Sequence, residues 1–144
     1  MLSLTFYTNK VPTGFAGCAG GPVVLIRPAY RADVGLLKHE QMHVDQWWLG
    51  VLLGGVVAAL LQLVPALAPW AQFWPVAVSA GAVLHPLAYK AIWQYRLWAE
   101  VQCYREQAQH YPDDRRLFFA QSLFTKYALA GHVTHEQILG RLKA

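Results

Sequence analysis

Hydrophobic residues fill the centre of the chain, and charged residues are confined to its two ends. From Gln46 to Tyr89 there is no Asp, Glu, Lys or Arg, and His85 is the one histidine. As a helix, Trp47–Leu67 would extend about 31 Å, which matches the hydrocarbon thickness of a bilayer. A turn at Pro65–Trp70 precedes a second apolar stretch over Gln72–Trp93. The pattern therefore predicts a long antiparallel helical hairpin.

The ends of this hairpin are marked by residues typical of a membrane protein. Gly50 and Gly54 have the spacing that lets two helices approach closely. Basic residues flank the base of the hairpin, whereas its tip, Ala66–Pro75, has none. The positive-inside rule then favours an inner-membrane protein with both termini on the cytoplasmic side. The alternative is a soluble cytoplasmic protein whose hairpin packs in a homo-oligomer. Tryptophans that resemble interfacial belts stand at the base, tip and return leg: Trp47, Trp48, Trp70, Trp74, Trp93 and Trp98.

The segment before the hairpin is predicted to be a small β region. Leu2–Thr8 and Val23–Ile26 are rich in β-branched and aromatic residues, which favours two strands. The run Gly17–Gly21 lies between them and is predicted to be a turn, because glycines punctuate it.

Helix signals account for the rest of the chain. Asp33 is a predicted N-cap, and Pro86 predicts a kink in the second leg. Thr134 and Gln137 form a predicted capping box. The fold class expected is mainly α with a small N-terminal β element (α+β). We expect one domain over residues 1–144, with a β region (1–32), a motif helix and first apolar leg (33–64), a second apolar leg and further helix (72–110) and C-terminal helices (113–144).

Composition narrows the classes of partner. The net charge is +4, but the basic residues are scattered, so we expect no nucleic-acid partner. Cys18 and Cys103 lie far apart and in no metal or redox spacing. Two reduced thiols are favoured over a disulfide.

The strongest chemical signal is the pentapeptide His39-Glu40-Gln41-Met42-His43, an HExxH motif in a predicted helix. Histidines four residues apart lie on one helical face, so both imidazoles can reach the same metal ion. Glu40 then stands beside a metal-activated water as a general base. The motif predicts a zinc site, with the metal site at the cytoplasmic mouth of the hairpin.

A catalytic zinc site needs a third protein ligand. The midpoint between the motif and Glu100 falls at the Pro69–Trp70 turn, so an antiparallel hairpin returns Glu100 to the level of the motif. At 1.5 Å per helical residue, His85 would lie about 22 Å short of the level of the motif, and His110 would lie about 15 Å beyond it. His132 and His135 lie at the predicted start of a helix, where capping and solvent exposure explain their presence without a metal. Glu100 is therefore the predicted third ligand, with pairing to an arginine as its alternative role.

The motif helix followed by a distant glutamate resembles the gluzincin branch of the zincin metallopeptidases. The segments Gly35–Trp47 and Arg96–Gln107 are similar to small metallopeptidase-like proteins of bacteria and their phages, which pair a GLLxHExxHxxQ helix with a later AExEAY helix. Gln102-Cys103 replaces the Glu-Ala of that pattern. The resemblance implies that His39, His43 and Glu100 bind Zn²⁺ and that Glu40 is the general base for hydrolysis of a peptide or protein substrate.

Roles beyond these four residues stay open. Asp45 is a candidate acceptor for a ligand imidazole. Tyr104, Arg96 and Tyr30 are candidates of similar weight for stabilising the oxyanion. The strand Val23–Ile26 is expected to line the cleft as an edge and to pair with an extended peptide. The alternative function is a small membrane structural or pore-associated protein with a non-catalytic or incidental zinc site.

Overall fold

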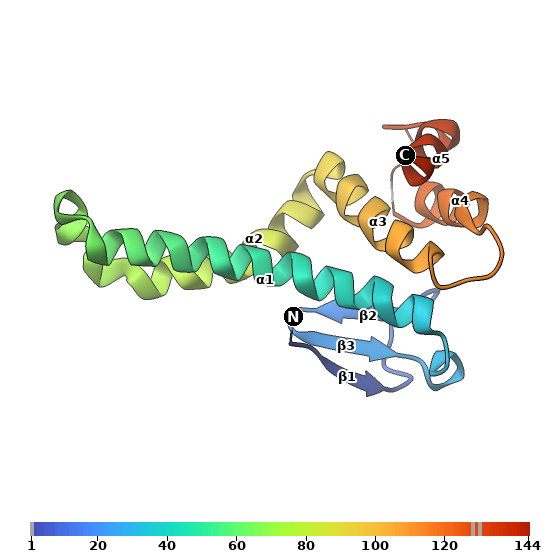
Figure 1. The fold of residues 1–144 in the computed structure, drawn as a ribbon, viewed down its shortest axis with the longest axis horizontal. Helices are drawn as coiled ribbons and strands as arrows, with labels where there is room; N and C mark the ends of the chain where they lie inside the picture. Colours follow the sequence, from blue (N-terminus) through green and yellow to red (C-terminus); the bar gives the residue numbers. More distant parts are fainter. Residues whose placement is uncertain (1, 128, 130) are drawn as a thin grey trace.

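The protein is mainly helical, with a small three-stranded sheet near its N-terminus (Figure 1). The computed structural model describes residues 2–127, 129 and 131–144. A long arm of two helices projects from a globular part, in which the sheet lies on one side of α1 and helices α3–α5 lie on the other. The predicted α+β class is confirmed.

The sheet contains one strand more than the sequence predicts. Strands β1 (Leu4–Tyr7) and β3 (Val23–Ile26) fall where expected and run parallel. The predicted turn is wrong over β2 (Gly17–Gly20), which pairs antiparallel with β3. The turn itself is confined to the residues that follow, where Gly21 has a φ of 59°. Small residues suit β2, because a Cβ on Gly17 would lie 2.8 Å from Oε1 of Glu40 on α1.

Helix α1 (Val34–Leu63) carries the motif through the middle of the globular part and continues into the arm. As predicted, Asp33 caps it by accepting a hydrogen bond from the Leu36 amide at 2.8 Å. Val44 packs against the sheet with Val24 and Ile26, and all three are buried. The motif is thereby held between the sheet and the helices on the far side of α1.

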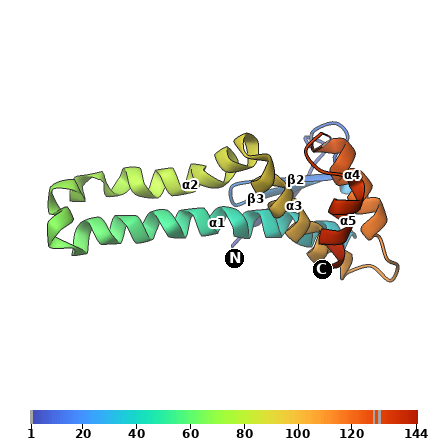
Figure 2. The ribbon, with the colours of Figure 1, turned by 90° about the horizontal axis from the view of Figure 1, so that it is seen from above.

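In the arm, α1 and α2 (Trp74–Ala91) lie side by side in opposite directions (Figure 2). Glycines allow this close approach, as the sequence predicts. A Cβ on Gly50 would lie 2.6 Å from the carbonyl oxygen of Gly81, and one on Gly54 would lie 2.5 Å from that of Ala77. The two backbones are therefore in direct contact.

The arm turns earlier than the symmetric hairpin requires. After α1 the chain forms the 3₁₀ helix η2 (Pro65–Phe73), which folds back along α1, since the Gln62 amide donates to the Ala71 carbonyl at 2.9 Å. A symmetric hairpin would place His85 level with residue 56, but its backbone nitrogen lies 3.8 Å from the Cβ position of Gly50. The return leg is therefore shifted toward the base by about six residues, or about 9 Å.

Pro86 lies inside α2, which continues to Ala91, and the helix ends at a break at Ile92 (φ −116°, ψ 104°). The kink expected at Pro86 stays a prediction. Proline has no N–H to donate to the carbonyl of residue 82. That carbonyl accepts a 2.7 Å hydrogen bond from the Trp47 indole on α1. The neighbouring helix thus supplies the donor that the proline lacks. Beyond Ile92, α3 (Trp93–Ala108) takes a different direction and crosses over α1.

The C-terminal helices form the main apolar core with α3. Helices α4 (Arg116–Lys126) and α5 (His135–Lys143) follow, and the predicted capping box of Thr134 and Gln137 begins α5. The side chains at the centre of this core have no solvent exposure: Leu97, Leu123, Leu129 and Ile138. This core fixes α3 against the globular part and so positions its other face over the motif.

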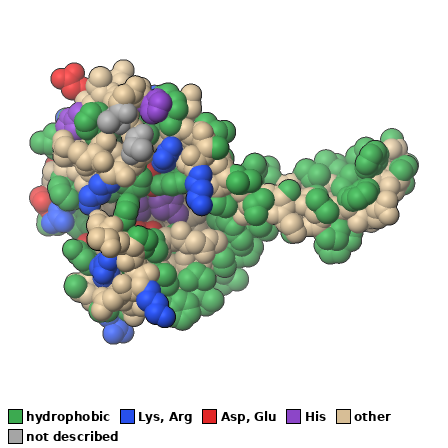
Figure 3. Space-filling model, turned by 180° about the vertical axis from the view of Figure 1, so that it is seen from behind, with side chains coloured by type: hydrophobic (Ala, Val, Ile, Leu, Met, Phe, Trp, Pro, Cys, Tyr) green, Lys and Arg blue, Asp and Glu red, His purple; other side chains and the backbone are tan. Residues whose placement is uncertain are grey.

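The arm exposes large apolar side chains and carries no Asp, Glu, Lys or Arg between Gln46 and Tyr89. Figure 3 shows it covered by hydrophobic and uncharged side chains, with Lys and Arg on the globular part. Two segments, Val34–Leu63 and Pro65–Ala91, are long and apolar enough to cross a membrane, and their most apolar windows are only 28% and 6% buried. Core helices of a soluble protein are mostly buried, so these values set the arm apart from such helices.

Candidate metal centre

Three of the predicted site residues converge where α3 crosses α1. His39 and His43 are one turn apart on α1 and present Nε2 to the carboxylate of Glu100 on α3. His39 Nε2 lies 3.5 Å from Glu100 Oε2, and His43 Nε2 lies 3.3 Å from Oε1. Glu100 is 1% exposed. Two imidazoles and a carboxylate therefore share one buried space.

These separations fit a metal centre better than a set of hydrogen bonds. Nitrogen and oxygen ligands of tetrahedral zinc, at their usual bond lengths, lie roughly 3.3–3.6 Å apart. Good N–H···O hydrogen bonds are shorter, at about 2.7–3.2 Å. Among the described residues, Glu100 Oε2 is buried without a hydrogen-bond partner. A cation between the three side chains would satisfy it, so the donor set fits zinc.

The protonation states of His39 and Glu100 suit metal binding. Burial lowers the pKa of His39 to about 4, so its imidazole is neutral and keeps a free lone pair at neutral pH. Burial by itself would raise the pKa of Glu100, but the neighbouring His43 outweighs it and the net shift is downward. The Tyr89 hydroxyl also donates a hydrogen bond to Glu100 Oε1. Glu100 is therefore ionised, as a metal ligand must be.

A glutamine orients the second imidazole. Gln46 Oε1 lies 3.1 Å from His43 Nδ1, and its amide donates to the Ala99 carbonyl on α3 at 3.1 Å. Because this oxygen only accepts, Nδ1 carries a proton. Burial by itself would lower the pKa of His43, but Cys103 and Glu100 outweigh it and the net shift is upward. Without a metal Nε2 is therefore protonated too, and a bound metal ion would displace that proton. The sequence offered Asp45 for such a role, whereas the side chain at Nδ1 is that of Gln46.

Glu40 lies on the side of α1 that faces the sheet. It is 5% exposed and packs against Gly17 of β2. Burial raises the pKa of Glu40 to about 7. A carboxyl group with that pKa can take up and return protons near neutral pH, which is what a general base requires.

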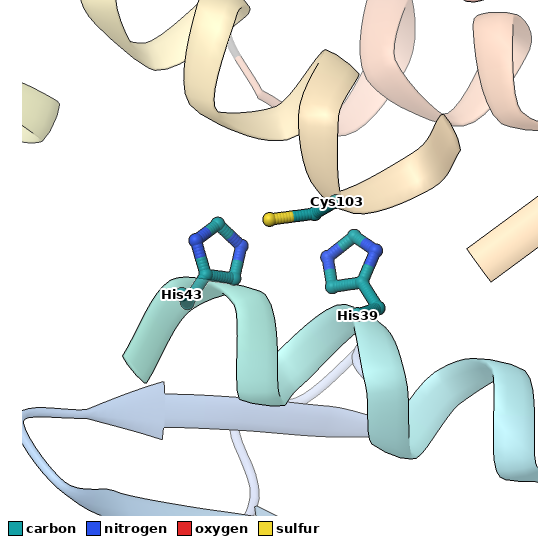
Figure 4. A group of neighbouring side chains, drawn as sticks. All are labelled: His39, His43 and Cys103. Atoms are coloured by element: carbon teal, nitrogen blue, oxygen red, sulfur yellow. The ribbon is translucent and has the colours of Figure 1, made fainter. Parts of the chain in front are cut away.

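The structure adds a residue to the cluster that the sequence did not single out. The ligand atoms of His39, His43 and Cys103 all lie within 4.8 Å of one another (Figure 4). Cys103 comes from α3, and its side chain points toward the two imidazoles. Its spacing of three residues from Glu100, which places both on one helical face, was the available signal.

The cluster opens into a cavity of about 310 Å³ at the base of the arm. Its walls include Glu40, β2, Trp47 and His85. Two expectations are therefore wrong. Val23–Ile26 was expected to line the cleft as an edge strand, but it is the central strand, and the edge strand β2 lines the cleft. His85 was expected to fall short of the site, but it reaches the cavity because the return leg is shifted toward the base. The ring centroid of His85 lies 6.2 Å from that of His43, and His85 Nδ1 lies 2.9 Å from the Tyr95 hydroxyl.

A second cavity of about 530 Å³ shares lining residues with the first. His39 and Glu40 line both cavities. Two of the oxyanion candidates, Tyr30 and Tyr104, line this second space. The ring of Tyr104 also packs edge-on against His39, with centroids 4.4 Å apart.

The remaining candidates lie elsewhere. Arg96 is one turn before Glu100 on α3, is half-buried, and is not among the described residues that line either cavity. His110 lies 3.3 Å from Glu106, and His132 stacks on Trp93. His135 is the first residue of α5.

Comparison with known proteins finds no matching family model, no matching curated protein and no matching solved structure.

Proposed function

We propose that the protein is a zinc-dependent metallopeptidase that its apolar arm holds in a membrane. The supporting observation is the convergence of His39, His43 and Glu100 in one buried space, with Glu40 in the wall of the adjoining cavity. This arrangement has the donors of a three-ligand catalytic zinc site and a carboxylate suited to act as base. It also agrees with the resemblance of the motif helix and the later glutamate to gluzincins.

His39, His43 and Glu100 would hold the ion. When bound in such a site, zinc lowers the pKa of a water molecule to about 7 and polarises a substrate carbonyl. Gln46 contributes by fixing the tautomer and the ring orientation of His43. Tyr89 holds the carboxylate of Glu100 by donating a hydrogen bond to it.

Glu40 carries the proton transfers. It accepts the proton of the attacking water and delivers it to the leaving amine as the peptide bond breaks. Its buried position against β2 keeps bulk water away from the carboxylate and brings its pKa near neutrality. A positioned base of this kind typically raises the rate of hydrolysis by roughly 10²–10⁴-fold.

The substrate strand lies along β2 in this proposal. An edge strand offers unpaired backbone N–H and C=O groups, which can pair with an extended peptide. Strand β2 is an edge of the sheet, and it lines the cavity next to the cluster. The small side chains of Cys18 and Ala19 leave room for the peptide.

The arm would place this cavity at a membrane surface. Trp47 lines the cavity and also marks the base of the apolar arm, where aromatic residues favour the bilayer interface. The basic residues lie beyond the base, which favours a cytoplasmic site. The cavity would then face peptides close to the inner membrane.

The test is hydrolysis by the Glu40→Gln variant. The purified protein, in detergent and loaded with one equivalent of zinc, is incubated with an unfolded casein and with a mixed peptide library. We expect the wild type to cut peptide bonds, and Glu40→Gln to lose at least about 10²-fold in rate while keeping its zinc. Glu106→Gln is the matched control, because Glu106 is a half-exposed glutamate on α3 that pairs with His110. Undiminished hydrolysis by Glu40→Gln would refute the mechanism.

A further inference from the structure

Cys103 belongs to the cluster but has no role in the proposed three-ligand site. It has no solvent exposure, and its side chain points at the two imidazoles (Figure 4). Buried cysteines most often act as small hydrophobic residues. This one instead lies in a polar environment, because its neighbours are two histidines, the Glu100 carboxylate and an amide.

The surroundings of the sulfur are those of a metal ligand. The Gln46 amide that fixes His43 also lies 3.8 Å from Cys103 Sγ, at the limit of a weak hydrogen bond to sulfur. Sγ and the two imidazole nitrogens fall within 4.8 Å of one another. Sulfur and nitrogen ligands of tetrahedral zinc lie roughly 3.5 Å apart, so a displacement of about 1 Å brings Sγ to bonding distance. The buried and unpartnered Glu100 Oε2 is a second sign that the same space is built for a cation.

We propose that Cys103 is a fourth protein ligand of the resting metal centre. This proposal rests on the metal-binding part of the proposed function and not on hydrolysis. His39, His43, Glu100 and Cys103 then supply two nitrogens, one oxygen and one sulfur. Binding exchanges the S–H proton, which leaves to solvent, for a metal–sulfur bond, and release of the sulfur takes a proton back.

A fourth ligand changes what the site does at rest. Catalytic zinc sites keep one position open, whereas sites closed by four protein ligands are inert. The thiolate must therefore leave before a water molecule can take its place, and the enzyme is latent until it does. A thiolate also favours zinc over magnesium and manganese, which prefer oxygen ligands.

Cobalt provides a direct readout, because a thiolate bound to Co²⁺ gives an intense charge-transfer absorption in the near ultraviolet. The metal-free full-length protein, in detergent, is titrated with Co²⁺ alone. We expect the sulfur-to-cobalt band in the wild type and in Cys18→Ser, and its loss in Cys103→Ser. Cys18 is the matched control, since it lines the same cavity from β2 but is not in the His39–His43–Cys103 cluster. Zinc affinity should fall in Cys103→Ser by at least the roughly 10–100-fold that changes around metal ligands cost.

The outcomes separate this inference from the proposed function. One bound cobalt without a sulfur band in the wild type overturns the fourth ligand and leaves the three-ligand peptidase intact. A band that persists in Cys103→Ser also overturns it. A band that disappears in Cys103→Ser supports the inference even where no peptide is hydrolysed. If the zinc-loaded protein is active, Cys103→Ser should hydrolyse faster by about tenfold or more, because its fourth position is open.

Discussion

At the level of single residues, the site divides into side chains that local spacing predicts and side chains that only the fold brings in. His39, Glu40 and His43 follow from helical periodicity, because residues four apart share a face. Gln46 and Cys103 gain their roles from contacts across 53 and 57 residues, and no local pattern encodes such contacts. The sequence therefore indicated His39, His43 and Glu100 as candidate ligands, but it did not indicate the contacts that Gln46 and Cys103 make with them.

The amide of Gln46 provides a test of how the ligands are oriented. Gln46→Leu removes the acceptor at His43 Nδ1 and the hydrogen bond to Ala99 but keeps most of the side-chain volume. We expect a loss of roughly 10–100-fold in zinc affinity, measured by competition with a chelating dye. Gln62→Leu is the control, since it also removes an amide-to-carbonyl hydrogen bond but in the arm. Equal affinity in the two variants would show that Gln46 has no part in the site.

At the level of helices, Glu100 reaches the motif by a different path from the one the sequence suggested. The apolar pattern predicts a straight hairpin that turns at Pro69–Trp70. The arm turns earlier, so a straight second leg would carry Glu100 beyond the motif by about 9 Å. The break at Ile92 redirects α3 across α1 and compensates for this shift. Periodicity predicted the helices, but the break depends on tertiary contacts that it does not contain.

Adjacent glycines in α1 test the packing of the arm. A Cβ on Gly54 would lie 2.5 Å from the Ala77 carbonyl and 3.0 Å from the Gly81 Cα, whereas one on Gly55 would have no atom within 4 Å. Gly54→Ala forces the helices apart, and we expect it to destabilise the protein by about 1–3 kcal/mol. Gly55→Ala should be neutral or stabilise by up to about 1 kcal/mol, because alanine favours helix.

The measurement is the thermal unfolding midpoint of both variants in the same detergent. Equal midpoints for Gly54→Ala and Gly55→Ala would mean that α1 and α2 do not pack through their glycines.

At the level of the whole molecule, the protein combines a globular part that has its own core with an arm that has almost none. In the globular part the core lies between α3, α4 and α5. Along the arm, large apolar side chains such as Leu53, Val56 and Leu60 are about half exposed. Exposed apolar surfaces of this extent favour a partner, and the partner we propose is a bilayer, which accepts every face of both helices.

Fractionation of cells tests this placement. We expect the full-length protein to sediment with membranes, to resist an alkaline carbonate wash and to be released by detergent. Leu53→Arg should shift it toward the soluble or aggregated fractions, because an arginine at mid-span costs about 2.5–3.5 kcal/mol. Leu117→Arg is the control, since Leu117 is similarly exposed but lies on α4. A wild-type protein found in the cytosol as a defined oligomer would support the soluble alternative instead.

The most direct test of the metal centre is the zinc content of protein purified without a histidine tag. We expect about one zinc per chain in the wild type and in Glu106→Gln, and little or none in His43→Ala and Glu100→Gln. Glu100→Gln preserves the size of the side chain, so its loss of zinc would report on ligation and not on packing. Wild-type protein without bound zinc, or Glu100→Gln with undiminished zinc, would contradict the site proposed for His39, His43 and Glu100.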